Sequence, residues 1–190
     1  MENIFTAHFQ FHFHDRTDML SSVIAILQTP FMLLGMALLF IAVPRIDPLK
    51  QNIEQFRGYF DVFIILVLVF MIAVYLQTIL WNKGIQISLN VTLPIGLGLL
   101  FYNTSILVEN AKMNWFIGIR TPWTLSSEVV WDKTHKVGGK LFKIAGLIGL
   151  ADVFFQPYTV YDILIPVLFV ASFPSYILIS PTNSYEQVRF

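Results

Sequence analysis

The sequence predicts an all-α fold, a polytopic transmembrane helical bundle of about five helices with a cytoplasmic amphipathic loop helix. Of its 190 residues, 56% are hydrophobic and only 13% are charged, whereas soluble domains contain about 25% charged residues. Three stretches also lack Lys, Arg, Asp and Glu over roughly the 20 residues or more that a helix needs to cross a bilayer. These stretches are 19–44, 62–82 and 84–108.

The first part of the chain is divided by this pattern into two regions. Residues 1–18 are expected to form an external N-terminal segment, and residues 19–108 to contain the first three transmembrane helices. Pro30 is expected to kink the first helix. Pro94 and two nearby glycines in the third helix are expected to produce either a local break or a close approach of another helix.

The last two transmembrane helices are predicted within residues 141–180, followed by a cytoplasmic tail at 181–190. The fourth helix, 141–155, has an apolar core that is short for a span and contains Asp152. A carboxylate at membrane depth is costly, so Asp152 is a candidate functional residue. The fifth helix, 163–180, is uncharged.

The basic residues predict the orientation, because Lys and Arg mark cytoplasmic loops. Only Arg16 and Lys83 fall on one side of the predicted membrane. The other ten are Arg45, Lys50, Arg57, Lys112, Arg120, Lys133, Lys136, Lys140, Lys143 and Arg189. We therefore expect a multi-pass protein of the cell membrane with its N-terminus outside, the loop 109–140 inside and its C-terminus in the cytoplasm.

The loop 109–140 contains three of the four Trp residues, a residue type that prefers the membrane interface. A helix over 126–137 would place Trp131 and His135 on one side. The Gly138–Gly139 pair would then end or bend this helix. The expected result is a short amphipathic helix on the inner leaflet.

Two interpretations of this loop remain open. It could be a recognition or active surface built from Arg120, Glu128, Trp131 and His135, or an interfacial helix that only anchors the loop. A membrane enzyme using His135 with Glu128 is the weaker form of the first interpretation, because no nucleophile or metal set accompanies them.

The same loop resembles the signature of the SdpI family of bacterial membrane proteins. The resemblance is carried by NWFIGIRTPWTLSSE at 114–128, then VW at 130–131 and KTHKVGGKLF at 133–142. A second stretch, 44–59, resembles part of the domain of unknown function that often precedes this signature. Relatives of this architecture usually have one more helix before a His- and Phe-rich external stretch, and this chain begins at that stretch.

The resemblance implies a protein of toxin immunity, of membrane signalling or of both, which is not an enzyme and needs no cofactor. The family's named member protects its cell from a secreted toxin, and its toxin-bound form is thought to hold a transcriptional repressor at the membrane. The implied partners are thus the lipid bilayer, a peptide or protein toxin and a cytoplasmic repressor. The candidate residues of the loop 114–139 are Asn114, Trp115, Gly118, Arg120, Thr121, Pro122, Trp123, Ser126, Glu128, Trp131, His135, Gly138 and Gly139.

The residues alone also allow other functions. A small-solute or ion transporter could use the third helix, interrupted at Pro94, together with Asp152. The histidines His8, His12 and His14 could bind a metal, although an extended strip resting its Phe side on the outer leaflet explains them more simply. Net charge is zero, so no basic face indicates nucleic acid, and the absence of Cys excludes disulfides and Cys-type zinc sites.

Overall fold

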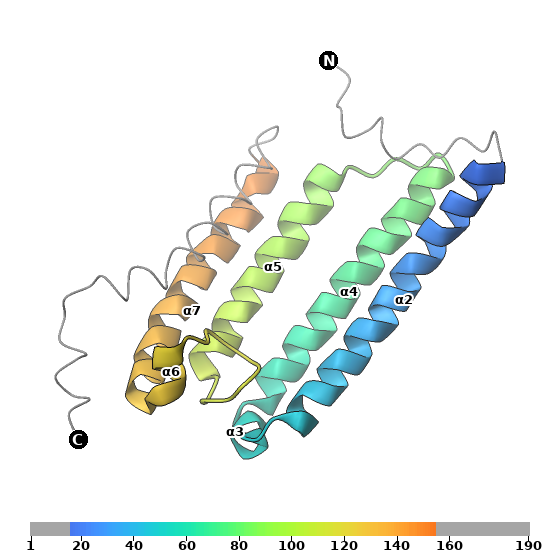
Figure 1. Ribbon diagram of the computed structural model, residues 1–190. Helices are drawn as coiled ribbons and strands as arrows, with labels where there is room; N and C mark the ends of the chain where they lie inside the picture. Colours follow the sequence, from blue (N-terminus) through green and yellow to red (C-terminus); the bar gives the residue numbers. More distant parts are fainter. Residues whose placement is uncertain (1–15, 155–190) are drawn as a thin grey trace.

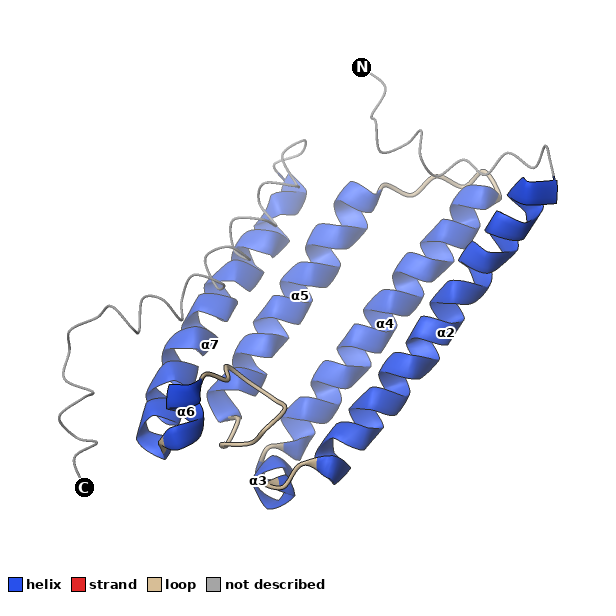
Figure 2. Cartoon of the chain, in the orientation of Figure 1, coloured by secondary structure: helices blue, strands red, loops and turns tan. Residues whose placement is uncertain are grey.

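The computed structural model describes residues 16–154, and this part of the chain contains helices and loops without any strand (Figure 2). Four long helices run alternately up and down (Figure 1): α2 (Arg16–Ile46), α4 (Arg57–Asn82), α5 (Leu89–Asn110) and α7 (Glu128–Ala151). The shorter elements are α3 (Lys50–Gln55), α6 (Pro122–Ser126) and the 3-10 turn η1 (Asp152–Phe154). The predicted helical bundle is confirmed. The predicted fifth helix 163–180, the tail 181–190 and the three N-terminal histidines lie outside the described residues.

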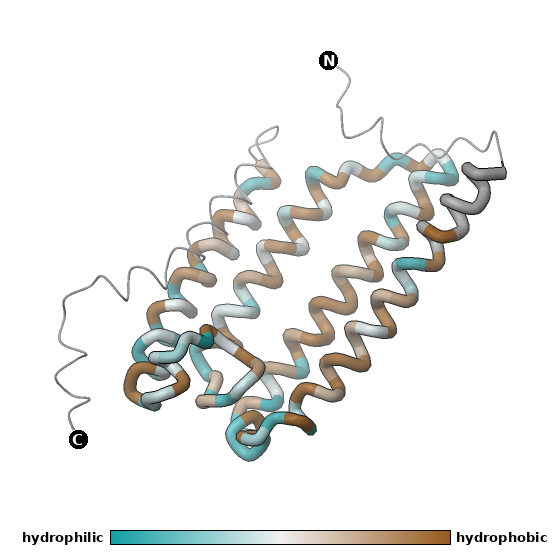
Figure 3. Tube along the Cα trace, in the orientation of Figure 1, coloured by the Kyte–Doolittle hydropathy of each residue, from teal (hydrophilic) through white to brown (hydrophobic). Residues whose placement is uncertain are grey.

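Three of these helices are long and apolar enough to cross a membrane, namely Leu27–Ile46 within α2, α4 and α5. Their large apolar side chains face outward, as shown by Phe31, which is 69% exposed, and Ile65, which is 59% exposed. Such surfaces need no protein cover in lipid. Figure 3 shows hydrophobic residues along the middle of α2 and α4, and hydrophilic residues around α3 and α6. The chain is therefore a multi-pass membrane protein.

The third predicted helix is not broken. α5 continues through Pro94 from Leu89 to Asn110, and of its two glycines Gly98 faces α7 while Gly96 faces Phe70 of α4. A Cβ added to Gly98 would lie 2.8 Å from the backbone N of Leu150, and a Cβ added to Gly146 would lie 2.6 Å from the backbone N of Tyr102. Of the two expected roles for the small residues, close helix approach is the correct one.

The predicted loop helix and the predicted fourth span are one continuous element, α7. Gly138 and Gly139 do not end it, because both are buried and the Glu109 side chain of α5 occupies the space that a Cβ of Gly139 would need. Residues 128–137 form the first half of α7, which packs against the loop that follows α5, and the position expected for 126–137 on the inner leaflet stays a prediction. The second half lies along α5.

The two ends of the bundle differ in charge. Figure 1 shows α3, α6 and the loop after α5 at one end, here called the loop end, and the 83–88 connector at the other. Basic residues in or beside the elements of the loop end are Arg45, Lys50, Arg57, Lys112 and Arg120. The structure thus brings together the connections that the positive-inside pattern assigned to one side.

Candidate functional site

Asn114, which is fully buried, fixes the conformation of the first part of the loop between α5 and α7. Its Nδ2 donates to the carbonyl oxygens of Lys112 and Ile117 at 2.8 and 2.9 Å. Its Oδ1 accepts from the backbone N–H groups of Phe116 and Ile117 at 2.9 and 2.6 Å. Both amide protons and the amide oxygen are in use, so this side chain acts as an internal brace for the turn.

The connection between α2 and α4 forms hydrogen bonds with the loop between α5 and α7. Asp47, buried to 2% exposure, accepts from the backbone N–H groups of Leu49 at 2.6 Å and Trp115 at 2.9 Å. Asn52 donates to the carbonyl oxygen of Met113 at 2.7 Å. The stretch 44–59 and the signature loop are therefore in direct contact. Asp47 and Asn52 were absent from the candidate residues, and the one signal that could have found them was the resemblance of the 44–59 stretch.

Trp131 and His135 of α7 fix the other side of the loop. The indole N–H of Trp131 donates to the carbonyl oxygen of Ala111 at 2.8 Å. The ring of His135, which is 1% exposed, stacks on this indole with centroids 3.9 Å apart. Its Nδ1 donates to the carbonyl oxygen of Trp131 at 2.8 Å, and its Nε2 accepts from the backbone N–H of Ile119 at 3.0 Å.

This pair of hydrogen bonds requires neutral His135, because only a neutral imidazole has one donor and one acceptor nitrogen. Burial is the largest influence and lowers the pKa of His135 from its ordinary value of 6.5. The hydrogen bond to Trp131 and the charge of Asp132 act in the opposite direction and are weaker. At neutral pH the ring therefore remains an acceptor for the loop.

The last part of the loop contains residues whose types favour its local conformation. Gly118 has φ +111°, a conformation that side chains disfavour, and His135 Nε2 occupies the space of its missing Cβ. Thr121 caps α6 in a capping box with Thr124, and Pro122 stands at the first helical position. Ser127 caps α7, and its side chain accepts from the backbone N–H of Val130.

The candidate residues separate into a buried and an exposed group. The buried group holds the loop to the helices and comprises Asn114, Trp131, His135, Gly138 and Gly139. The exposed group comprises Trp115, Gly118, Arg120, Pro122, Trp123, Ser126 and Glu128. Thr121 is half-buried. The structure does not bring Arg120, Glu128, Trp131 and His135 onto one surface, and it does not pair His135 with Glu128, because the buried ring nitrogens already have other partners.

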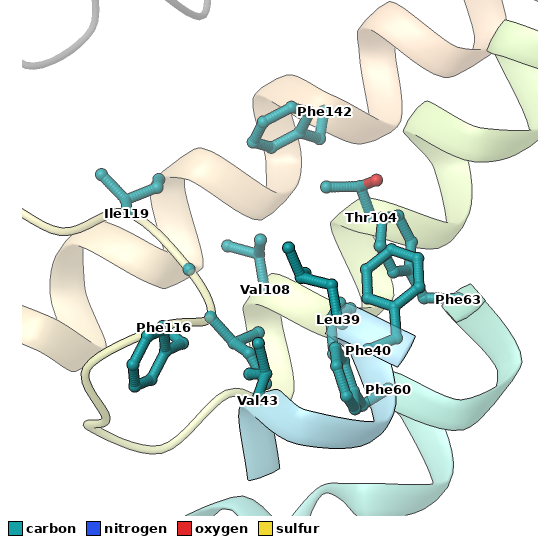
Figure 4. A pocket seen from close by; sticks show the side chains of 13 residues that line it. Leu39, Phe40, Val43, Phe60, Phe63, Thr104, Val108, Phe116, Ile119 and Phe142 are labelled. Atoms are coloured by element: carbon teal, nitrogen blue, oxygen red, sulfur yellow. The ribbon is translucent and has the colours of Figure 1, made fainter. Parts of the chain in front are cut away.

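An apolar pocket of about 370 Å³ opens between the helices beside this loop (Figure 4). α2, α4, α5, α7 and the loop all contribute to its wall, and Thr104 is its one polar side chain. The lining residues are Leu39, Phe40, Val43, Phe60, Phe63, Thr104, Leu107, Val108, Phe116, Ile117, Gly118, Ile119 and Phe142.

Two carboxylates lie between α5 and α7. Glu109 of α5 pairs with Lys143 of α7 at 3.4 Å. Asp152, the candidate in the predicted fourth span, is 2% exposed at the start of η1, and η1 packs against α5. Within residues 16–154, no group of three His, Asp or Glu side chains could hold a metal ion.

Comparison with known proteins adds independent information. Residues 110–180 match the SdpI/YfhL protein family. Over 122 residues the chain is 27% identical to the protein named "Immunity protein SdpI" of Bacillus subtilis (strain 168). The match covers 64% of this chain and 56% of that relative, so the chain spans little more than half of the relative's length. No solved structure matches the chain.

Proposed function

We propose that this chain, which belongs to the SdpI/YfhL family, is an immunity or signalling protein of the bacterial plasma membrane that recognises a partner through the loop 114–139. The name of its relative, "Immunity protein SdpI", supports the immunity role. The three membrane-type helices support this role, because a membrane protein would meet an agent that attacks the membrane.

The observation that carries this proposal is a rigid loop with exposed aromatic residues. Trp115 is 51% exposed and Trp123 is 50% exposed, while the backbone between them is held by the buried side chains of Asn114 and His135. Trp and Arg are the residue types that most often dominate recognition surfaces, and Arg120 lies between the two Trp residues. A loop ordered before binding loses less entropy when a partner binds.

The orientation belongs to the same proposal. With the loop end in the cytoplasm, the recognition loop would face a cytoplasmic partner such as a repressor, and the N-terminus would lie outside. The collection of basic residues at the loop end supports this direction.

The direct test replaces the immunity protein of Bacillus subtilis with this chain. Cells that carry the chain are expected to survive conditions that kill cells lacking both proteins, and equal killing would count against the immunity role. The double variant Trp115→Ala/Trp123→Ala should lose protection at unchanged membrane abundance. Phe31→Ala removes an aromatic ring of α2 that is even more exposed, at 69%, and should retain protection.

A transporter is the second candidate, and the burial of Asp152 favours it. A carboxylate at 2% exposure beside a membrane helix is expensive unless it has a task. Solute or ion flux into proteoliposomes should then fall in Asp152→Asn. Equal flux in Asp152→Asn and in the unchanged chain would contradict the transporter hypothesis.

A further inference from the structure

Residues 116–119, here called the strap, form one wall of the apolar pocket. All four residues line it, and Figure 4 shows Phe116 and Ile119 on the loop beside Val43 and Val108. The remaining wall comes from α2, α4, α5 and α7, which are long helices. The strap is therefore the only pocket wall among the described residues that is not part of a helix.

The strap is fastened at both ends by buried side chains. At its beginning, Asn114 accepts hydrogen bonds from the backbone N–H groups of Phe116 and Ile117. At its end, His135 accepts one from the backbone N–H of Ile119. The hydrogen bonds to Asn114 do not depend on pH, because its side-chain amide gains no proton near neutral pH. The hydrogen bond from Ile119 to His135 depends on a free lone pair at Nε2.

A proton on Nε2 removes this fastening. Nδ1 already donates to the carbonyl oxygen of Trp131, so a protonated ring would have two donors, and its Nε2–H would face the N–H of Ile119. Two donors repel each other, and the ring has little room beside the strap, because a Cβ added to Gly118 would collide with Nε2. Movement of the strap away from α7 relieves the conflict.

We propose that His135 is a proton-operated latch: its neutral ring holds the strap across the loop end of the apolar pocket, and its protonated ring releases the strap and opens the pocket. The direction of the pH response follows from burial, which lowers the pKa of His135 from 6.5. The native latched form binds fewer protons than the released form, so latching is complete above about pH 6.5 and is lost as the pH falls below it.

Charged groups on the surrounding elements do not replace His135 in this role. On α7, Asp132 favours the protonated ring, but burial outweighs it. On α5, Glu109 is paired with Lys143. On the loop, Arg120 is exposed and donates to the carbonyl oxygen of Trp115. Helix α6, residues 122–126, contains no titratable side chain.

The test uses the full chain in lipid nanodiscs with one spin label on the strap. The chain has no Cys, so Phe116→Cys provides a single attachment site, and its side chain is exposed enough to accept a label. Label mobility measured by electron paramagnetic resonance between pH 8 and pH 5 is expected to rise with a midpoint below 6.5. A label at Ser126 on α6 should not change, which separates strap release from unfolding.

Two variants of the labelled chain test whether His135 is the group that controls the strap. In His135→Gln the amide oxygen can accept from Ile119 without titrating, so the strap label should be insensitive to pH. If this variant does not fold, the triple variant His8→Gln/His12→Gln/His14→Gln leaves His135 as the only His and should keep the full response. A flat profile in that triple variant, or an unchanged profile in folded His135→Gln, would overturn the latch.

Discussion

Asp47, Asn114 and His135 are buried polar side chains, and each accepts a hydrogen bond from a backbone N–H group of the loop between α5 and α7. A buried polar group is costly without a partner and contributes stability with one. These three side chains therefore specify one conformation of the loop. The sequence marked Asn114 and His135 through the family signature but could not show their partners. The bond from Asp47 joins residues 68 positions apart, and no local pattern reports such a contact.

Asn114→Ala tests how far one side chain determines the loop. The substitution leaves the N–H groups of Phe116 and Ile117 without their acceptor, so we expect the free energy of unfolding to fall by about 2 kcal/mol or more. Thermal unfolding in detergent measures it. Asn110→Ala is the matched control, because that exposed amide makes one bond to the carbonyl oxygen of Ile106. Equal losses in both variants would contradict the bracing role.

Gly118→Ala tests the close contact beneath His135. Both Gly118 and Gly84 have positive φ, and a side chain in that conformation costs roughly 1–2 kcal/mol. A Cβ at Gly84 would meet open space, whereas one at Gly118 would collide with the imidazole. We expect Gly118→Ala to lower the melting temperature clearly more than Gly84→Ala does. Indistinguishable melting temperatures would mean that the ring moves aside freely.

At the scale of elements, α7 is the helix that sequence patterns described least well. The sequence predicts an amphipathic helix for its first half and a short membrane span for its second half. It also predicts that the Gly138–Gly139 pair ends or bends the first helix. These expectations follow local preferences, but tertiary contact decides the outcome here. Glu109 and Lys143 pair across the junction between the halves, and the close approach to α5 occurs where α7 has no side chain. Glycine is thus used for packing rather than for termination.

The α5–α7 contact predicts a cost for side chains at Gly146. A Cβ there would lie 2.6 Å from the backbone N of Tyr102 and 2.8 Å from the carbonyl oxygen of Gly98. Because backbone atoms cannot rotate away, Gly146→Ala should destabilise the protein by about 1–3 kcal/mol. The matched control is Gly35→Ala on α2, where nothing lies within 4 Å. That control should be neutral or slightly stabilising. Denaturation followed by circular dichroism would compare them.

At the scale of the whole molecule, composition and segment length were sufficient to predict a helical membrane bundle, because crossing lipid imposes one requirement on every helix. The apolar pocket could not be predicted in this way. Its wall combines residues from Leu39 to Phe142, contributed by four helices and a loop. Each of these residues alone resembles an ordinary lipid-facing or core residue, and only the arrangement of the helices creates the space between them.

The basic loop end predicts the direction of the bundle in the membrane. The 83–88 connector and α6 lie at opposite ends (Figure 1), so a reagent that cannot cross the membrane should reach only one of them. With the basic loop end inside, Gln86→Cys should react with an impermeant maleimide on intact cells. Ser126→Cys should react only after permeabilisation. Both side chains are exposed and the chain has no Cys of its own, so burial and background labelling do not distort the comparison. The reverse pattern would place the recognition loop outside and would direct the search for its partner to secreted molecules.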